Sequence, residues 1–222
     1  MLMHASTVGL RYRALAPVLA AVLSMVPYPS PAAATHGGPE IGSFLSCNDP
    51  DRDPPRCTSV GNDNQHFVYF GESLSEELAS ALRDALFEDY RPTDFIVFER
   101  HRITSVTDVI VESQDYGDNG AAGWVNCPPE APQGFNQLGH RWCQRQDLRF
   151  NLNPLYAVFF ADEVSREYVA CHELGHTVGL RHWGNPPQSS GPVGATCMNV
   201  NTPDGPTHLH PADVEHINAY PY

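Results

Sequence analysis

The amino-acid sequence predicts an α+β fold, in which a mixed, twisted sheet is covered by helices. The first observation is a strand–helix–strand–strand order between residues 66 and 111, which is typical of a mixed sheet with a covering helix. The second is a long helix near 162–178 whose apolar residues recur at helical spacing. The third is a proline-rich region after residue 184, which ends in a short helix over 211–220 and indicates a small irregular C-terminal subdomain.

The N-terminal segment, residues 1–34, has the features of a signal peptide. Arg11 and Arg13 supply a basic start, residues 14–26 form an apolar run, and Ala32–Ala34 offers small residues for cleavage near Ala34. The apolar run is too short for a stable membrane anchor and contains Pro17. We therefore expect a secreted, extracellular protein, with an N-terminal extension over 35–65 and one domain over 66–222.

Charge and composition exclude one class of partner. The chain of 222 residues has a formal charge of −13, and removing Arg11 and Arg13 with the signal peptide makes it −15. Phosphate backbones bind clustered positive charge, so we expect no nucleic-acid partner. The oligomeric state is left open by the sequence.

The cysteines predict disulfides, because all six follow the signal segment and an exported chain meets an oxidising environment. Six cysteines allow fifteen pairings. The most economical set joins neighbours along the chain. It consists of Cys47–Cys57, Cys127–Cys143 and Cys171–Cys197. The last bridge would tie the long helix to the segment around Met198.

The first half of the domain is expected to contain three strands and one helix. Strands are predicted over 66–70, 95–99 and 107–111, where β-branched and aromatic residues gather. Ser73 is the predicted N-cap of the helix, with Glu76 three residues later as a capping box. The helix should end by Tyr90, before Pro92.

The second half is expected to begin with an irregular loop over 124–146, closed by its two cysteines. Residues 147–152 then alternate polar and apolar, as in a half-exposed strand. The long helix should start near Asp162 or Ser165 and end near Val178. Its predicted core-facing residues are Val164, Tyr168, Cys171, Leu174 and Val178.

The residues from His172 to His182 carry the strongest chemical signal. His172 and His176 are four apart, so on a helix both imidazoles face one point in space. Glu173 places a carboxylate beside them. Gly179 can adopt the left-handed conformation that ends a helix, and that turn would bring His182 to the same point. Three nitrogen ligands with a fourth position open is the catalytic form of a zinc site.

This pattern, H-E-x-x-H-x-x-G-x-x-H followed by Met198, resembles the metzincin metalloproteases. The resemblance implies Zn²⁺ held by His172, His176 and His182, Glu173 as the catalytic general base, and Met198 as a structural floor. It implies a metzincin-like zincin domain that hydrolyses peptide bonds in a protein or peptide substrate. The domain is matrixin-like, but Trp183 matches no branch and Val200 excludes a tyrosine ligand.

The resemblance suggests three further features. Strand 147–152 is expected to be the edge strand that pairs with an extended substrate. Asp115 and Asp118 are candidate Ca²⁺ ligands, although an ordinary turn is favoured there. Pro55-Arg56-Cys57 is similar to the matrixin latency segment, but Thr58 and Ser59 depart from it.

Several alternatives stay open at this stage. The chain could be a secreted zinc-stabilised binding protein, or a latent protease with one dedicated substrate. The histidines of the helix could merely face solvent. His208 and His210 are two apart and could bind a second zinc, but unliganded surface histidines are favoured there.

Overall fold

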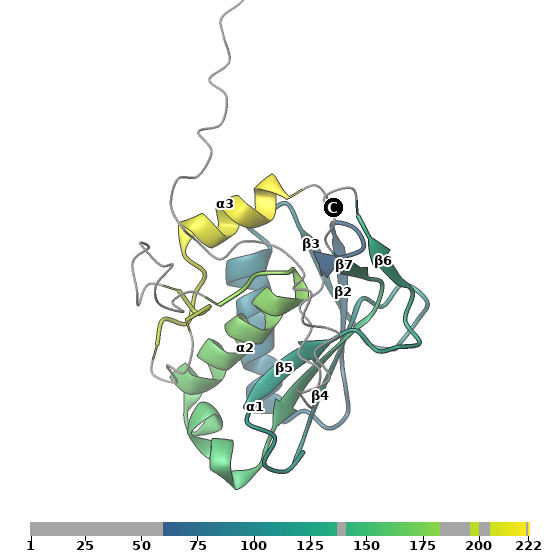
Figure 1. Ribbon diagram of the computed structural model, residues 1–222. Coiled ribbons are helices and arrows are strands. Elements are labelled where there is room, and N and C mark those ends of the chain that lie inside the picture. Colours follow the sequence, from purple (N-terminus) through teal and green to yellow (C-terminus); the bar gives the residue numbers. More distant parts are fainter. Residues whose placement is uncertain (1–59, 137–140, 183–195, 200–204, 221) are drawn as a thin grey trace, which may run out of the picture. The chain divides into compact units, whose positions relative to one another are not determined.

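The computed structural model of the chain describes residues 60–136, 141–182, 196–199, 205–220 and 222 (Figure 1). All of them belong to one compact unit, His36–Tyr222. The expected signal peptide, the Cys47–Cys57 pair and most of the 35–65 extension therefore lie outside the described part of the chain.

A five-stranded mixed sheet forms the centre of the domain. Four strands are parallel and the fifth, at one edge, is antiparallel, in the order β3-β2-β4-β8-β5. This arrangement confirms the predicted α+β class with a mixed sheet. The strands are β2 (Gln65–Phe70), β3 (Ile96–Arg100), β4 (Val109–Gln114), β5 (Gly123–Asn126) and β8 (Gln146–Asn151).

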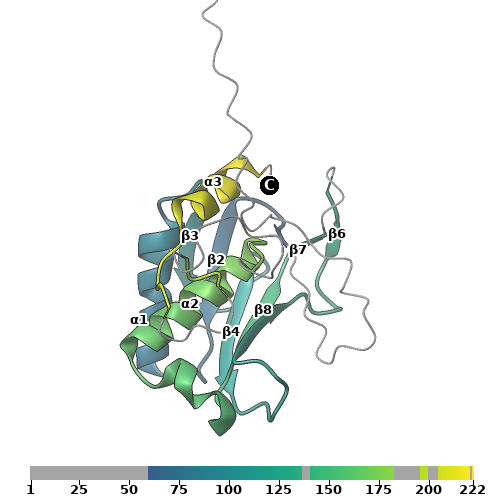
Figure 2. The same ribbon diagram turned by 60° about the vertical axis from the view of Figure 1, so that its left-hand side comes forward.

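Two helices, α1 (Glu76–Ala85) and α2 (Glu163–Thr177), cover the same face of this sheet (Figures 1 and 2). Alternate strand residues point toward them because successive side chains lie on opposite faces of a strand. The helices and this sheet face enclose the core. Its fully buried strand residues are Val68, Val109, Val111, Leu148 and Phe150.

The start of α1 differs from the prediction. Ser75, and not Ser73, is the N-cap, and its side chain accepts a hydrogen bond from the Leu78 N–H. The Ser73 hydroxyl instead accepts from the Ser113 N–H at the end of β4. Ser73 and Ser75 both fit the local sequence pattern of a helix N-cap. The contact of Ser73 with β4 distinguishes them, because it uses the Ser73 hydroxyl. The helix continues as a π-helical turn, η2 (Leu86–Tyr90), and ends at Tyr90 as predicted.

The region 124–146 is more regular than predicted. It contains part of β5 and two short strands, β6 (Gln133–Phe135) and β7 (Arg141–Cys143). These strands form a second sheet with β1 (Val60–Gly61), in the order β1-β7-β6. Strands of two to four residues are too short to show a period in the sequence. The predicted disulfide Cys127–Cys143 is present, and β1 lies inside the range expected to be an extension.

The position of strand 147–152 also differs from the prediction. The corresponding strand, β8, lies between β4 and β5, so it is an interior strand. The edge strand is β5, which pairs with β8 in antiparallel fashion. Polar–apolar alternation reports that one face is buried, and it is the same for an interior strand and an edge strand.

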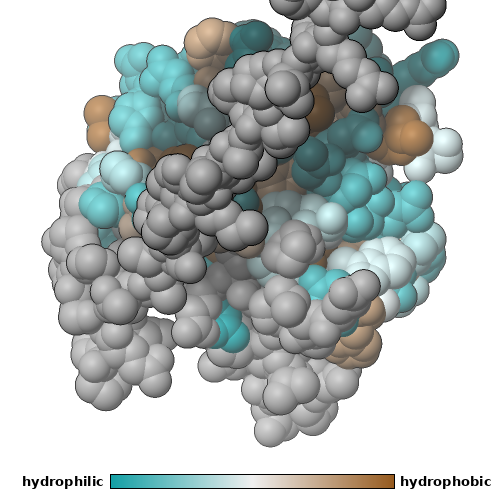
Figure 3. All heavy atoms as spheres, turned by 90° about the horizontal axis from the view of Figure 1, so that it is seen from above, coloured by the Kyte–Doolittle hydropathy of each residue, from teal (hydrophilic) through white to brown (hydrophobic). Residues whose placement is uncertain are grey.

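The remaining described helices are short. The 3-10 helix η3 (Pro154–Phe160) leads into α2, and α3 (Pro211–Ala219) is the closing helix that the sequence predicts. Of the predicted core stripe on α2, four residues are buried, but Val164 in the first turn is 48% exposed. No helix in the described ranges has the length and apolar character needed to cross a membrane. Seen from above, the described surface is mostly hydrophilic, with scattered hydrophobic residues (Figure 3).

Candidate metal centre

The last turns of α2 bring two of the predicted ligands together. His172 and His176 are one turn apart on the buried side of the helix, and their Nε2 atoms are 3.1 Å from each other. Each residue is only 8% exposed. Glu173, between them in sequence, is 4% exposed. The helical spacing predicted from the sequence is therefore present.

The third histidine arrives through the turn that ends α2. Gly179 has a φ of 91°, which places it in the left-handed region that glycine adopts without strain. The Leu180 N–H donates to the Gly175 carbonyl and the Gly179 N–H donates to the His176 carbonyl, as in a Schellman motif. The chain reverses there, and His182 Nε2 comes within 3.0 Å of Nε2 of both His172 and His176.

Hydrogen bonds fix the ring tautomers of the two helical histidines. His172 Nδ1 lies 2.7 Å from the Cys197 carbonyl, and His176 Nδ1 lies 2.7 Å from the Leu180 carbonyl. A carbonyl only accepts, so each Nδ1 carries the hydrogen and each Nε2 presents a lone pair. Burial first, and His182 second, lower the pKa of His172 to about 3, and the same causes lower that of His176 well below its usual value. Both rings are therefore neutral.

This arrangement suits a cation. Two Nε2 lone pairs that face each other at 3.1 Å repel, and no arrangement of ring hydrogens satisfies three nitrogens 3.0–3.1 Å apart. A zinc–nitrogen distance of about 2.0–2.1 Å reaches a common point from all three atoms. Within the described part of the chain, these histidines are the one group of three acidic, cysteine or histidine side chains that could hold a metal ion. Imidazole nitrogens suit zinc, copper, iron or nickel.

Met198 lies beneath the ligand helix, as expected. It is fully buried, and its sulfur occupies the space that a side chain at Gly175 would fill. The predicted disulfide Cys171–Cys197 joins the residues that directly precede His172 and Met198. The bridge therefore holds the helix and the methionine segment together next to the histidines.

Asp213 and Tyr168 hold the segment 196–199 around Met198, a role that the sequence does not predict. Thr196 donates its hydroxyl hydrogen to Asp213 Oδ2 at 2.5 Å, and Asp213 is fully buried at the start of α3. The Tyr168 hydroxyl donates to the Asn199 carbonyl at 2.5 Å. Tyr168 was recognised only as a core residue. A buried carboxylate needs a hydrogen-bond donor, but its partner lies 17 residues away and no local pattern marks it.

A third missed residue, Gly123, opens the space beside Glu173. A Cβ at Gly123 would lie 2.5 Å from Glu173 Oε1 and 2.7 Å from its Cδ. Any other residue at this position would therefore collide with the carboxylate. Gly123 begins β5, so the edge strand of the sheet passes directly beside Glu173.

The outward main-chain groups of β5 pair with no other strand among the described residues. The Asn151 N–H donates to the Ala122 carbonyl, which places residues 122, 124 and 126 toward β8. The N–H and C=O groups of Gly123 and Val125 therefore point away from the sheet. Among the described residues β5 is the edge strand. An added strand there would lie alongside Glu173.

The other candidate ligands are used elsewhere in the fold. Asp115 accepts from the Gly117 N–H and the Asn153 amide, and Asp118 accepts from the Tyr156 hydroxyl. No third acidic or histidine side chain among the described residues joins them in a metal-binding group, so a Ca²⁺ site there stays a prediction.

His208 and His210 do not converge on one point either. His208 Nδ1 lies 3.4 Å from the Asp89 carboxylate on η2. His210 is the N-cap of α3, where its Nδ1 accepts from the Ala212 N–H. Among the described residues these two histidines belong to no group that could hold a metal.

Comparison with known proteins adds no family. No protein-family model matches the chain, and no curated protein matches it. Trp183, Val200 and the Pro55-Arg56-Cys57 segment lie outside the described residues. The functional conclusion therefore depends on the geometry of the metal centre and on the sequence pattern that builds it.

Proposed function

We propose that this chain is a secreted zinc-dependent endopeptidase with a metzincin-like zincin domain. The observation that carries the proposal is the convergence of three imidazole nitrogens, 3.0–3.1 Å apart, beside the Glu173 carboxylate. Three protein ligands leave a coordination position open for water, whereas structural zinc sites are closed by four. The resemblance of the same residues to the metzincin pattern also supports the proposal.

Zinc bound there would supply a Lewis acid that polarises the scissile carbonyl and lowers the pKa of a bound water toward about 7. Glu173 would accept the proton of the attacking water and deliver it to the leaving amine. His172 and His176 are held by carbonyl acceptors on their Nδ1 atoms, so their rings are oriented before any ligand binds. Met198 acts by packing beneath the helix and binds no substrate.

The edge strand β5 is the proposed substrate-binding element. An extended peptide can pair with the outward N–H and C=O groups of Gly123 and Val125, as peptides do at other open sheet edges. The absent side chain of Gly123 lets that peptide and Glu173 approach each other. Main-chain pairing holds any extended sequence, so β5 positions the substrate, whereas side-chain pockets determine the cleavage preference.

The proposal is tested on the mature chain with its disulfides intact. Bound zinc is titrated, and an unbiased peptide library is incubated with the wild type, Glu173→Ala and His176→Ala. We expect one zinc per wild-type chain and cleavage within peptides. Glu173→Ala should keep the zinc but lose at least about 10²-fold in turnover, whereas His176→Ala should lose both.

The other results have defined meanings. Zinc without any cleavage, in wild type and variant alike, would contradict the endopeptidase and favour a zinc-stabilised binding protein or a latent enzyme with one dedicated substrate. Equal cleavage by wild type and Glu173→Ala would remove Glu173 from the mechanism. A wild-type chain that binds no zinc would contradict the whole proposal.

A further inference from the structure

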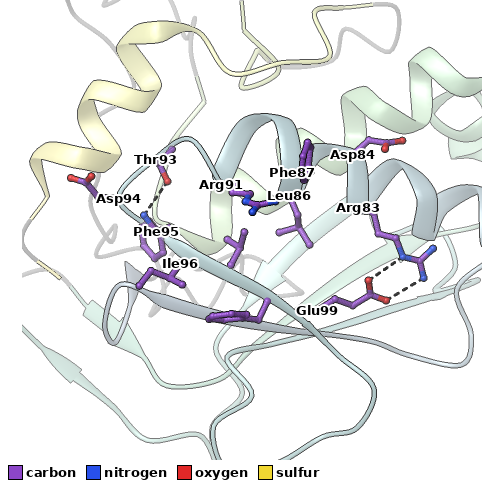
Figure 4. A pocket seen from close by; sticks show the side chains of 12 residues that line it. Arg83, Asp84, Leu86, Phe87, Arg91, Thr93, Asp94, Phe95, Ile96 and Glu99 are labelled. Carbon is purple, nitrogen blue, oxygen red and sulfur yellow. Dashed lines mark hydrogen bonds and ion pairs between the residues drawn. The ribbon is translucent and has the colours of Figure 1, made fainter.

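The opposite edge of the central sheet, at β3, is a second open edge. Among the described residues β3 pairs only with β2. A groove of about 780 Å³ runs between β3 and the α1–η2 helix (Figure 4). Phe87, on the helix side of the groove, is strongly exposed (62%). Ile96 (49%) and Phe98 (45%) of β3 are also exposed. Their side chains lie on the opposite face of the sheet, because the neighbouring Glu99 points toward Arg83 of α1. The groove includes none of the three histidines.

The hydrogen bonds of β3 determine which of its groups face outward. The Ile96 N–H donates to the Asn64 carbonyl at the start of β2. Residues 96, 98 and 100 therefore point their main-chain groups toward β2, and Val97 and Glu99 point theirs away from the sheet. An antiparallel strand centred on Val97 would exchange two hydrogen bonds with the Val97 main chain.

The sequence of this edge is complementary to itself. If two copies of residues 94–100 pair in antiparallel fashion about Val97, Ile96 lies opposite Phe98 and Asp94 lies opposite Arg100. Asp94 forms no ion pair with another described residue. The Arg100 guanidinium lies over the Phe67 ring, 4.1 Å from its centroid, and has no carboxylate in ion-pair distance among the described residues, whereas the neighbouring Glu99 is paired with Arg83 at 3.1 Å. We propose that β3 is a dimerisation edge, at which two copies of this chain join their sheets about a two-fold axis through Val97.

The two-fold axis also determines where the grooves of the two copies lie in the dimer. An axis that pairs two β3 strands in antiparallel fashion is perpendicular to the sheet, so the helices of both copies lie on the same face. The exposed Phe87 of each copy then faces the groove of the other. The Arg91 guanidinium lies over the Phe87 ring, 5.0 Å from its centroid, and holds the ring at the mouth of the groove. An interface made of one strand pair and its flanking side chains is at the low end of the size range of specific protein–protein interfaces.

The test is the mass of the full mature chain in solution. Sedimentation velocity between about 1 µM and about 300 µM should show a reversible monomer–dimer equilibrium in the micromolar range. In the Asp94→Arg variant, the new arginine of each copy lies opposite Arg100 of the other copy. The dimer then contains two pairs of like charges, so the dissociation constant should rise about tenfold or more. Arg100→Asp should do the same, and Asp94→Arg combined with Arg100→Asp should restore the dimer. Glu215→Arg, an equal charge reversal on an exposed residue of α3, is the control.

Hydrogen exchange and a proline variant test the hydrogen-bonded pairing itself. The Val97 and Glu99 amides should become protected as the concentration rises, and Val97→Pro should abolish the dimer while the monomer stays folded, because its lost N–H faces outward. A chain that is monomeric throughout the range contradicts the proposal, as does a double variant that fails to restore the dimer. Protection of these amides at every concentration would mean that another segment covers β3.

Discussion

At the scale of single residues, the three glycines of the candidate metal centre act because they have no Cβ atom. Gly179 permits the positive φ that brings His182 back to the other two histidines, and this role is visible in the sequence because of the fixed spacing to His176 and His182. Gly123 and Gly175 instead make room for Glu173 and Met198. Their partners are distant in sequence, so only the structure identifies these two roles.

Gly123→Ala is expected to impair hydrolysis without loss of the metal. The added methyl group collides with the Glu173 carboxylate, and displacing a general base by about 1 Å lowers turnover by up to about 10²-fold. Steady-state kinetics together with zinc stoichiometry measure the effect. Gly134→Ala is the matched control, because it adds the same methyl group to a strand of the other sheet, against Trp142. Unchanged turnover in Gly123→Ala would show that Glu173 tolerates displacement.

At the scale of elements, the C-terminal end of α2 is fixed by a buried polar network. Thr177 donates its hydroxyl hydrogen to the Leu174 carbonyl and accepts from His66 Nε2 on β2 at 2.8 Å. The Gln146 side chain on β8 donates to the Thr177 carbonyl. Two strands thereby position the helix end that carries His176. Burial lowers the pKa of His66 to about 4.

The neutral His66 predicts a pH-dependent stability. Between pH 6.5 and about 4 the unfolded chain binds a proton at His66 that the folded chain does not, so stability present above pH 6.5 is lost as the pH falls through this range. The loss attributable to His66 is up to about 3 kcal/mol. Urea unfolding of wild type and His66→Gln at pH 7.5 and pH 4.5 isolates it. If both proteins lose the same stability, His66 is not buried in the neutral form.

The two disulfides offer a matched comparison between stability and metal binding. Cys171–Cys197 and Cys127–Cys143 span 26 and 16 residues, so removing either by paired Cys→Ala changes should cost about 3–4 kcal/mol of unfolding free energy. Only the loss of Cys171–Cys197 should also weaken zinc binding, because it frees the helix from the methionine segment. Denaturation and zinc competition measure both quantities. Equal zinc affinity in the two variants would limit the Cys171–Cys197 bridge to a stabilising role.

At the scale of the whole molecule, metal binding and folding should be coupled. The three histidines come together only in the folded chain, so a zinc ion held by them would bind the native state and stabilise it. Free zinc at about 1,000 times its dissociation constant would add about 4 kcal/mol. Chelation should therefore lower the melting temperature of the wild type but leave that of His176→Ala unchanged. The same decrease in both proteins would place the stabilising metal elsewhere.

The features that depend on local spacing can be predicted from the sequence alone. The α+β class, the span of the ligand helix, the turn at Gly179 and the candidate ligands all follow from periods of two and 3.6 residues and from residue types at fixed intervals. The two described disulfides were also predicted, because each joins cysteines that are neighbours in the series.

The contacts between segments that are distant in the sequence are known from the three-dimensional fold alone. It made β5 the edge strand in place of β8, assigned the helix cap to Ser75 in place of Ser73, and brought Gly123 against Glu173 and Asp213 against Thr196. The physical reason is common to all four. Local patterns record that a side chain is buried or a donor is satisfied, whereas the identity of the partner is set by packing between elements far apart in sequence.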